Sequence, residues 1–217
     1  PAQANSSNWG SVIETQRWDT ALKIGKVNPK LTYRSWGLQT AFSHHDQNAF
    51  FGNRIYDIQH ESAYLNLIYN SIIGNTNTTF KTGINATYDS YDEQVDSTPW
   101  TRTDRNIGAY IEVSSNSEIL NWVAGVRVDT HNNLGTFVTP RFHLRYTPFE
   151  TAIIRAAVGQ GRKAANIFAE QQKQFGSNRQ IKIRNNGGAF YGLQPEKAWN
   201  YGVSYRQLLL RGNQQAD

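Results

Sequence analysis

The stretch "ILNWVAGVRVDT", residues 119–130, decides the fold class because its side chains alternate between apolar and polar. In an extended chain, one face would carry Leu120, Trp122, Ala124, Val126 and Val128. The other face would carry Asn121, Gly125, Arg127 and Asp129, with Val123 as an apolar exception. A period of two residues is that of a β-strand, whose successive side chains point to opposite faces. The stretch therefore predicts a strand with an apolar and a polar face.

The same alternation recurs along the chain in segments of roughly ten residues, the length with which a tilted strand crosses a bilayer. About nine strands are predicted, near residues 18–26, 32–43, 62–72, 78–89, 105–115, 119–130, 139–147, 151–159 and 197–209. The fold class is all-β, an antiparallel meander that forms part of a transmembrane β-barrel.

The connections between these strands alternate in length. Short connections are expected at 27–31, 73–77, 116–118 and 148–150, and longer ones at 44–61, 90–104, 131–138 and 160–196. Outer-membrane barrels have short periplasmic turns and long outer loops, so the alternation favours such a barrel. A soluble β-sandwich also alternates, but charges and glycines along whole polar faces, and aromatic residues near strand ends, favour the membrane barrel.

Composition excludes several other classes. No 18 consecutive residues are apolar, so a transmembrane helix is not expected. The absence of Cys excludes disulfides and thiolate metal sites. The net charge of +5 comes from scattered basic residues, which argues against a nucleic-acid partner.

Residues 157–170, "AVGQGRKAANIFAE", contain a G-x-G-x-x-A motif that resembles a dinucleotide-binding turn. That site needs parallel strands joined by helical crossovers, whereas the neighbouring connections are hairpin turns. We therefore expect no nucleotide site. Instead, Gly159 and Gly161 are expected to let the chain leave the barrel rim and enter its longest loop.

Residues 139–206 carry a series of spaced motifs, "TPRFHLRYTP", "TAIIRAAVGQGRKAANIFAE" and "YGLQPEKAWNYGVSY". They resemble the barrel of TonB-dependent outer-membrane receptors, closest in character to those of the Bacteroidetes, and "GVRVDTHNN" at 125–133 resembles the strand just upstream. The matching residues are Pro140, Arg141, Tyr146, Arg155, Gly159, Gly161, Arg162, Ala165, Asn166, Glu170, Leu193, Pro195, Glu196, Asn200, Tyr201 and Gly202.

The resemblance implies a barrel of about 22 strands with an N-terminal plug domain and a TonB box. Residues 1–217 would then be one partial β-barrel domain, an interior fragment without the plug and the remaining strands. The parent would reside in the outer membrane of a Gram-negative bacterium, in contact with its lipid. It would import a scarce small-molecule ligand, such as a siderophore or other iron chelate, haem, cobalamin or another metal complex. The TonB–ExbB–ExbD complex would supply the energy.

Candidate ligand contacts lie in the expected outer loops: His44, His45 and Asp46 in "SHHDQ", and Arg162, Lys163, Arg179 and Arg184 in the longest loop. A second set shares the polar stripe of the barrel wall: Arg127, Arg141, His143, Arg145 and Arg155. These side chains face either an anionic ligand or carboxylates of the plug, and plug contact is favoured.

No enzyme is expected. Neither a Ser/His/Asp arrangement nor an H-E-x-x-H zinc motif is present. No cofactor and no resident metal is implied. The functional alternatives are a passive porin or adhesin barrel and a soluble β-sandwich binding module.

Overall fold

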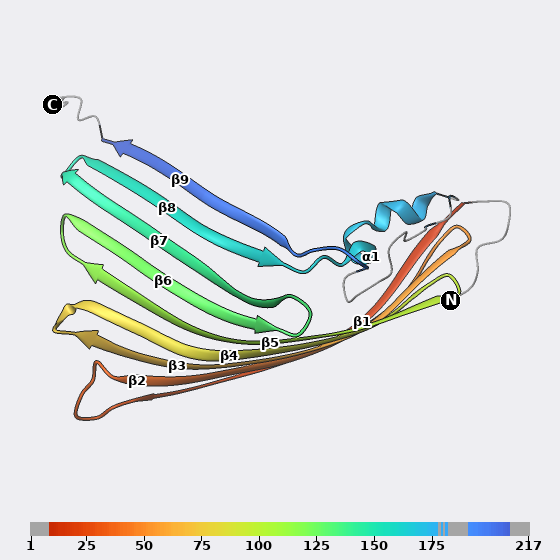
Figure 1. Cartoon of the computed structure of the whole chain (residues 1–217), viewed down its shortest axis with the longest axis horizontal. Coiled ribbons are helices and arrows are strands. Elements are labelled where there is room, and N and C mark those ends of the chain that lie inside the picture. Colours follow the sequence, from red (N-terminus) through yellow and green to blue (C-terminus); the bar gives the residue numbers. More distant parts are fainter. Residues whose placement is uncertain (1–8, 178, 180, 182–190, 209–217) are drawn as a thin grey trace, which may run out of the picture.

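The computed structural model describes residues 9–177, 179, 181 and 191–208. Within them, one antiparallel sheet contains nine strands in the order β1 to β9, so every strand pairs with its neighbours in the chain (Figure 1). The strands are β1 (Ser11–Val27), β2 (Ser35–Phe51), β3 (Arg54–Ile73), β4 (Asn75–Val95), β5 (Thr98–Asn116), β6 (Leu120–His131), β7 (Gly135–Phe149), β8 (Ala152–Lys163) and β9 (Glu196–Gln207). The helix α1 (Ile167–Glu170) and the 3₁₀ turn η1 (Gln172–Gly176) lie between β8 and β9. The predicted antiparallel meander is confirmed.

The sheet has two ends, which are named here by their connections. At the turn end, the connections are residues 28–34, 74, 117–119 and 150–151. At the loop end, they are residues 52–53, 96–97 and 132–134 and the long segment from 164 to 195 that carries α1. Figure 1 shows α1 beside the loop end.

The prediction of long loops at 44–61, 90–104 and 131–138 is wrong. Residues 44–51 pair with 54–61, and residues 90–95 pair with 98–103, so both segments are β-hairpins with two-residue turns. A polar strand needs no apolar face to pair, because the ladder satisfies its own backbone hydrogen bonds. β3 is 20 residues long, about twice the length of roughly ten that crosses a bilayer.

The turn end also differs from the prediction at its first connection. The strand expected from residue 32 begins at Ser35. The Asn28 side-chain oxygen accepts hydrogen bonds from the amides of Lys30 and Leu31 at 2.9 and 3.0 Å, which holds a turn in place. Gly74 has φ +74°, so the β3–β4 turn needs a backbone conformation that favours glycine.

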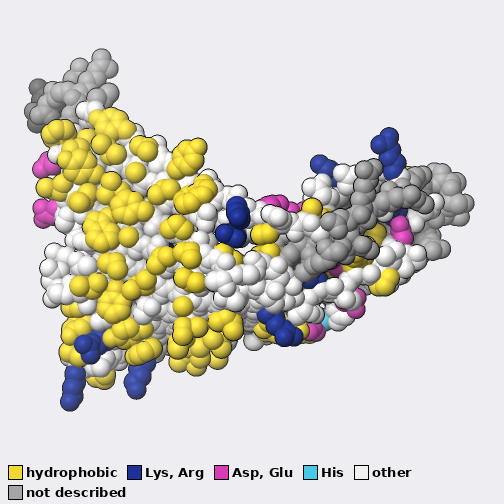
Figure 2. Space-filling view, in the orientation of Figure 1, with side chains coloured by type: hydrophobic (Ala, Val, Ile, Leu, Met, Phe, Trp, Pro, Cys, Tyr) yellow, Lys and Arg dark blue, Asp and Glu magenta, His cyan; other side chains and the backbone are white. Residues whose placement is uncertain are grey.

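The register of the strands places apolar side chains on one face of the sheet. One row runs across it from β1 to β7 through Ile24, Leu38, Leu67, Ile84, Ala109, Val128 and Val138. Figure 2 shows hydrophobic side chains gathered over the part of the sheet away from α1. Many are open to solvent, with Trp18 at 72% and Ile107 at 65% exposure. We call this the apolar face.

The opposite face is polar over the same levels. The adjacent row consists of Lys23, Gln39, Asn66, Asn85, Gly108, Asp129 and Phe137. At the loop end, the polar face also carries the buried cluster of the protein, where α1 and η1 pack. The sheet therefore offers an apolar band to one side and a polar surface to the other, as a barrel wall does.

The sheet is open within the described residues, because β1 and β9 each pair with a single neighbour. In β9, Tyr201 and Val203 are 84% and 79% exposed. Unpaired strand edges carry free amide and carbonyl groups that a bilayer does not tolerate. No helix among these residues is long and apolar enough to cross a membrane.

Candidate functional site

The segment after β8 folds back onto the polar face as a short capped helix. The Asn166 side-chain oxygen accepts a hydrogen bond from the Ala169 backbone amide at 3.2 Å. The Asn166 backbone amide donates to the Glu170 carboxylate at 3.1 Å. Lys163 forms an ion pair with Glu170 at 2.8 Å, which lowers the pKa of Glu170 and raises that of Lys163. A helix of four residues is not stable alone, so its order comes from these bonds and from packing on the sheet.

An aromatic cluster holds this segment against the sheet. Phe168, Phe175 and Tyr191 pack on residues that belong to β3 and β4, namely Tyr56, Ile58 and Val95. The rings of Tyr56 and Phe175 stack at 5.0 Å between centroids, and those of Phe168 and Tyr191 meet edge to face at 5.3 Å. We call these six residues the loop-end cluster. It excludes water from the polar face where the strands extend beyond the apolar band.

A single carboxylate lies at the centre of the loop-end cluster. Glu93 of β4 is 1% exposed. Its oxygens accept hydrogen bonds from the hydroxyls of Tyr56 at 2.8 Å and Tyr191 at 3.0 Å, and from the side-chain amide of Asn166 at 3.3 Å. Burial and the neighbouring Glu93 raise the pKa of both tyrosines, which therefore remain protonated donors. Glu93 thus joins β3, the α1 cap and the chain before β9.

Two arginines of the sheet hold backbone carbonyls of the same segment. Arg102 of β5 donates to the Ala165 carbonyl at 3.0 Å, lies 4.4 Å from the Tyr91 ring centroid and is 3.1 Å from Asp104. Arg54 of β3 donates to the Ser177 carbonyl at 2.8 Å. The sheet therefore binds both ends of the α1–η1 segment with charged donors.

The expectation that His44, His45 and Asp46 lie in an outer loop is wrong, because all three belong to β2. Alternation separates them: His45 lies on the polar face, and His44 and Asp46 on the opposite face. His44 is 3.4 Å from Glu61.

His45 pairs in register with His60, which contacts Asp89 at 3.1 Å. Burial, Arg17 and His60 lower the pKa of His45. In the described part of the chain, no group of three His, Asp or Glu side chains is placed to hold a metal ion.

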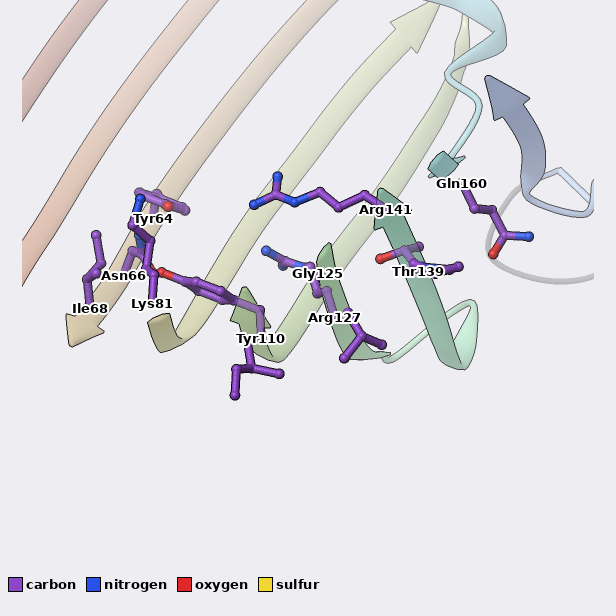
Figure 3. A pocket seen from close by; sticks show the side chains of 13 residues that line it. Tyr64, Asn66, Ile68, Lys81, Tyr110, Gly125, Arg127, Thr139, Arg141 and Gln160 are labelled. Carbon is purple, nitrogen blue, oxygen red and sulfur yellow. The ribbon is translucent and has the colours of Figure 1, made fainter. Parts of the chain in front are cut away.

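A hollow of about 410 Å³ opens in the middle of the polar face and contains two of the predicted wall arginines (Figure 3). Arg127 donates two hydrogen bonds to Asp129 at 2.6 Å. Arg141 lies over Gly125 and pairs with Glu112. The Tyr110 ring crosses β4 above Gly83, where a Cβ atom would lie 2.6 Å from the tyrosine oxygen. The positive charges of both arginines are therefore balanced inside the wall.

The remaining wall residues line a second hollow of about 490 Å³. Arg145 and Arg155 lie opposite each other in the register of β7 and β8, and His143 is on the same face. Ala157, Gly202 and Ser204, all small residues, also line this hollow. All five predicted wall residues thus lie on the polar face, but the structure divides them into two hollows.

The family-motif residues have mixed placements. Gly159 and Gly161 do not form a turn: they belong to β8, pair with Asn200 and Ala198, and lack positive φ. The strand continues past them because β9 supplies its ladder partners. Pro140 pairs with Val126 on the apolar face, and Glu196, which follows Pro195, starts β9 opposite Lys163.

The candidate loop contacts are dispersed. The expectation that Arg162 and Lys163 lie in the longest loop is wrong, because both belong to β8, where β9 supplies their ladder partners. Arg162 lies 4.8 Å from the Phe137 ring centroid, and Arg179 is exposed. Arg184 lies outside the described residues. Sequence reasoning missed Glu93 and the two tyrosines, because "YDSYDEQV" at 88–95 has polar residues on both faces and gives no alternation that would have extended β4 to this level.

Comparison with known proteins identifies the family. The family described as "TonB dependent receptor-like, beta-barrel" matches residues 3–216. No curated protein gives a significant match. Among solved structures, the siderophore receptor PirA from Pseudomonas aeruginosa has a TM-score of 0.70 at 13% identity, over 92% of this chain and 37% of that one. The copper transporter OprC has a TM-score of 0.63 at 14% identity, over 86% and 35%. The ferric citrate transporter FecA, unliganded, has a TM-score of 0.58 at 13% identity, over 90% and 32%.

The chain thus spans about a third of the length of these structures. TonB-dependent receptors are outer-membrane proteins of Gram-negative bacteria, and they are transporters, not enzymes. The apolar and polar faces described above are those that such a wall requires. The chain belongs to the TonB-dependent receptor family and forms part of its β-barrel.

Proposed function

We propose that this chain supplies wall strands and an outer loop to a receptor that imports a scarce metal complex with energy from TonB. The observation that carries the proposal is the two-faced sheet: an apolar band on one side, and a polar face with the docked α1 segment on the other. In this assignment the apolar face contacts lipid, the polar face lines the lumen, and the loop end is extracellular.

The proposed ligand class is a metal complex such as a siderophore, another iron chelate, haem or cobalamin. Support comes from the family and from the names of similar receptors, which refer to a siderophore, copper and ferric citrate. We propose a Bacteroidetes-like source for the receptor. The predicted ligand contacts remain His44, His45, Asp46, Arg162, Lys163, Arg179 and Arg184. Of these, His45 and Lys163 lie on the polar face.

The proposed partners are a plug domain within the lumen and the TonB–ExbB–ExbD complex. Residues 1–217 would form one continuous part of the barrel domain, with the remaining strands closing the edges at β1 and β9. The single sheet does not support the β-sandwich alternative, which requires two packed sheets. A passive porin or adhesin is the remaining alternative.

The test uses the complete receptor in a bacterium that lacks its own uptake of the chosen nutrient. Growth is measured with ferric siderophores, ferric citrate, haem, cobalamin or a copper chelate as the limiting source. The proposal expects growth on one of these compounds, which disappears when tonB is deleted. Uptake that persists without tonB would indicate a passive barrel, and no uptake of any metal complex would contradict the proposed ligand class.

A further inference from the structure

Two basic side chains are neighbours near the loop end of β8 and β9. Arg162 and Lys197 lie directly opposite each other in the register of the two strands. The alternation of side chains puts both on the apolar face, beyond the pair of Val158 and Tyr201. Like charges in directly opposite positions destabilise a sheet. An anion bound at this pair would therefore stabilise the wall.

The levels before this pair change from hydrophobic to amphipathic along the apolar face. Towards the turn end, the cross-strand pairs of this face are Val158 with Tyr201, Ala156 with Val203 and Ile154 with Tyr205. The next level towards the loop end pairs Gln160 with Trp199, and Trp is enriched where a membrane meets water. Figure 2 shows basic side chains at the border of the hydrophobic region near the loop end of β8 and β9. The two strands thus have the side-chain order of a hairpin that leaves lipid at the basic pair.

The length of β8 also places the basic pair at a membrane surface. Arg162 lies ten residues after Ala152, the first residue of the strand. About ten residues of a tilted strand cross a bilayer. Because Ala152 directly follows the turn at residues 150–151, Arg162 and Lys197 lie at the headgroups of the opposite leaflet.

The described residues do not neutralise this pair. Neither Arg162 nor Lys197 forms an ion pair within the described part of the chain. The carboxylates nearest in sequence belong to the polar face and its loop: Glu170 binds Lys163 at 2.8 Å, and Glu196 lies opposite Lys163. The charge of the basic pair is therefore open to an external anion.

The Arg162 guanidinium is held in place on one side. It lies 4.8 Å from the Phe137 ring centroid. The Nε atom of Arg162 is buried and has no hydrogen-bond partner among the described residues. An aromatic contact positions the group without accepting its N–H donors in the manner of an oxygen.

We propose that Arg162 and Lys197 bind a phosphate group of a lipid in the outer leaflet of the outer membrane. Charge complementarity supports this occupant, because a guanidinium binds two phosphate oxygens and the ammonium adds a second charge. Continuity also supports it, because the exposed apolar side chains of the same two strands, such as Tyr201 and Val203, would contact the acyl chains of that lipid. The inference rests on the proposed function only for its orientation, with the apolar face in lipid and the loop end outside the cell.

Native mass spectrometry of the full-length receptor in detergent tests this site. The probe is diphosphoryl lipid A, titrated against the unchanged receptor and against Arg162→Gln combined with Lys197→Gln. We expect the loss of two charges to weaken lipid binding by about 30-fold. Arg162→Lys combined with Lys197→Arg keeps both charges and should retain binding. Lipid A from which the phosphates have been removed should bind all forms equally weakly.

Lys26→Gln combined with Lys30→Gln is the matched control. Lys26 lies on the apolar face opposite Trp36, and Lys30 lies in the turn that follows β1, so this variant removes two charges at the turn end. It should leave lipid A binding unchanged. Equal binding by all variants, or loss of binding in the control alone, would overturn the site. Displacement of the lipid by inorganic phosphate at a similar concentration would assign a soluble anion and also overturn it.

The same variants separate this inference from the import function. Lipid binding requires neither tonB nor the imported compound, so loss of lipid binding in Arg162→Gln combined with Lys197→Gln, in a receptor without uptake, would retain the site and reject import. Arg162 is also among the predicted ligand contacts. If Arg162→Gln abolishes uptake while lipid A binding is unchanged, Arg162 contacts the transported ligand and the lipid site is rejected.

Discussion

Replacement of Glu93 by Gln should release the α1–η1 segment from the sheet without unfolding the barrel wall. The substitution preserves size but removes the charge that accepts three hydrogen bonds, from Tyr56, Tyr191 and Asn166. A hydrogen bond to a charged group contributes about 1 kcal/mol more than a neutral one. Three bonds therefore give about 3 kcal/mol, which corresponds to a change of about 100-fold in the docking equilibrium.

Hydrogen exchange measured by mass spectrometry on the full-length receptor in detergent reports this equilibrium. The amides of Glu170 and Gln174 donate within the segment at 3.0 and 2.8 Å, so their protection depends on its folding. We expect their exchange to accelerate by about 30- to 100-fold, while the amides of β3 and β4 remain protected. Asp92→Asn is the matched control, because Asp92 is exposed and lies on the opposite face from Glu93. Unchanged protection in Glu93→Gln would refute the central role of this carboxylate.

Three further predictions follow from particular contacts. Arg102→Lys loses the aromatic stacking on Tyr91 and the bond to the Ala165 carbonyl, so exchange in the α1 segment should accelerate by about tenfold; an unchanged rate would exclude this anchor. Gly83→Ala should reduce the amount of folded receptor in the outer membrane, because the added Cβ atom would lie 2.4 Å from the Leu67 carbonyl oxygen. Gly161→Ala is the control and should leave this amount unchanged, because a Cβ atom there would have no neighbouring atom within 4 Å. Because the pKa of His45 is lowered from its ordinary 6.5, the folded state binds fewer protons there than the unfolded chain. Protonation of His45 is therefore less favourable in the folded state than in the unfolded chain. The contribution of neutral His45 to the stability of the folded state is fully present above pH 6.5 and is lost as the pH falls. The thermal midpoint should drop less between pH 7.5 and 5.5 in His45→Gln than in the unchanged receptor, and equal drops would contradict the assignment.

The alternation of the sequence identified the strands and their faces because side-chain direction in a strand depends only on parity. Arg127 and Arg141 could be placed on the polar face for this reason, and the pairing of Arg127 with Asp129 requires only positions two residues apart. The pairing of Arg141 with Glu112 could not be anticipated, because it depends on the register across β5, β6 and β7.

The loop end was harder to predict for two physical reasons. The segments at 44–61 and 90–104 carry polar side chains on both faces and have no continuous apolar face, so they resemble loops although cross-strand pairing keeps them extended. The site around Glu93 combines donors that lie 37, 73 and 98 residues away in the chain. No local pattern brings Tyr56, Asn166 and Tyr191 together; only the docking of the α1 segment does.

Cysteine scanning across residues 80–89 tests the two-faced wall most directly. The 217 residues contain no natural Cys, so a spin label at each position of the full-length receptor reports local access to oxygen and to a water-soluble nickel complex. Substitutions such as Ala86→Cys, on the apolar face, should be accessible to oxygen and shielded from nickel. Substitutions such as Thr87→Cys, on the polar face, should show the reverse, with a period of two residues. Equal access to nickel along the whole stretch would contradict a lipid-facing wall.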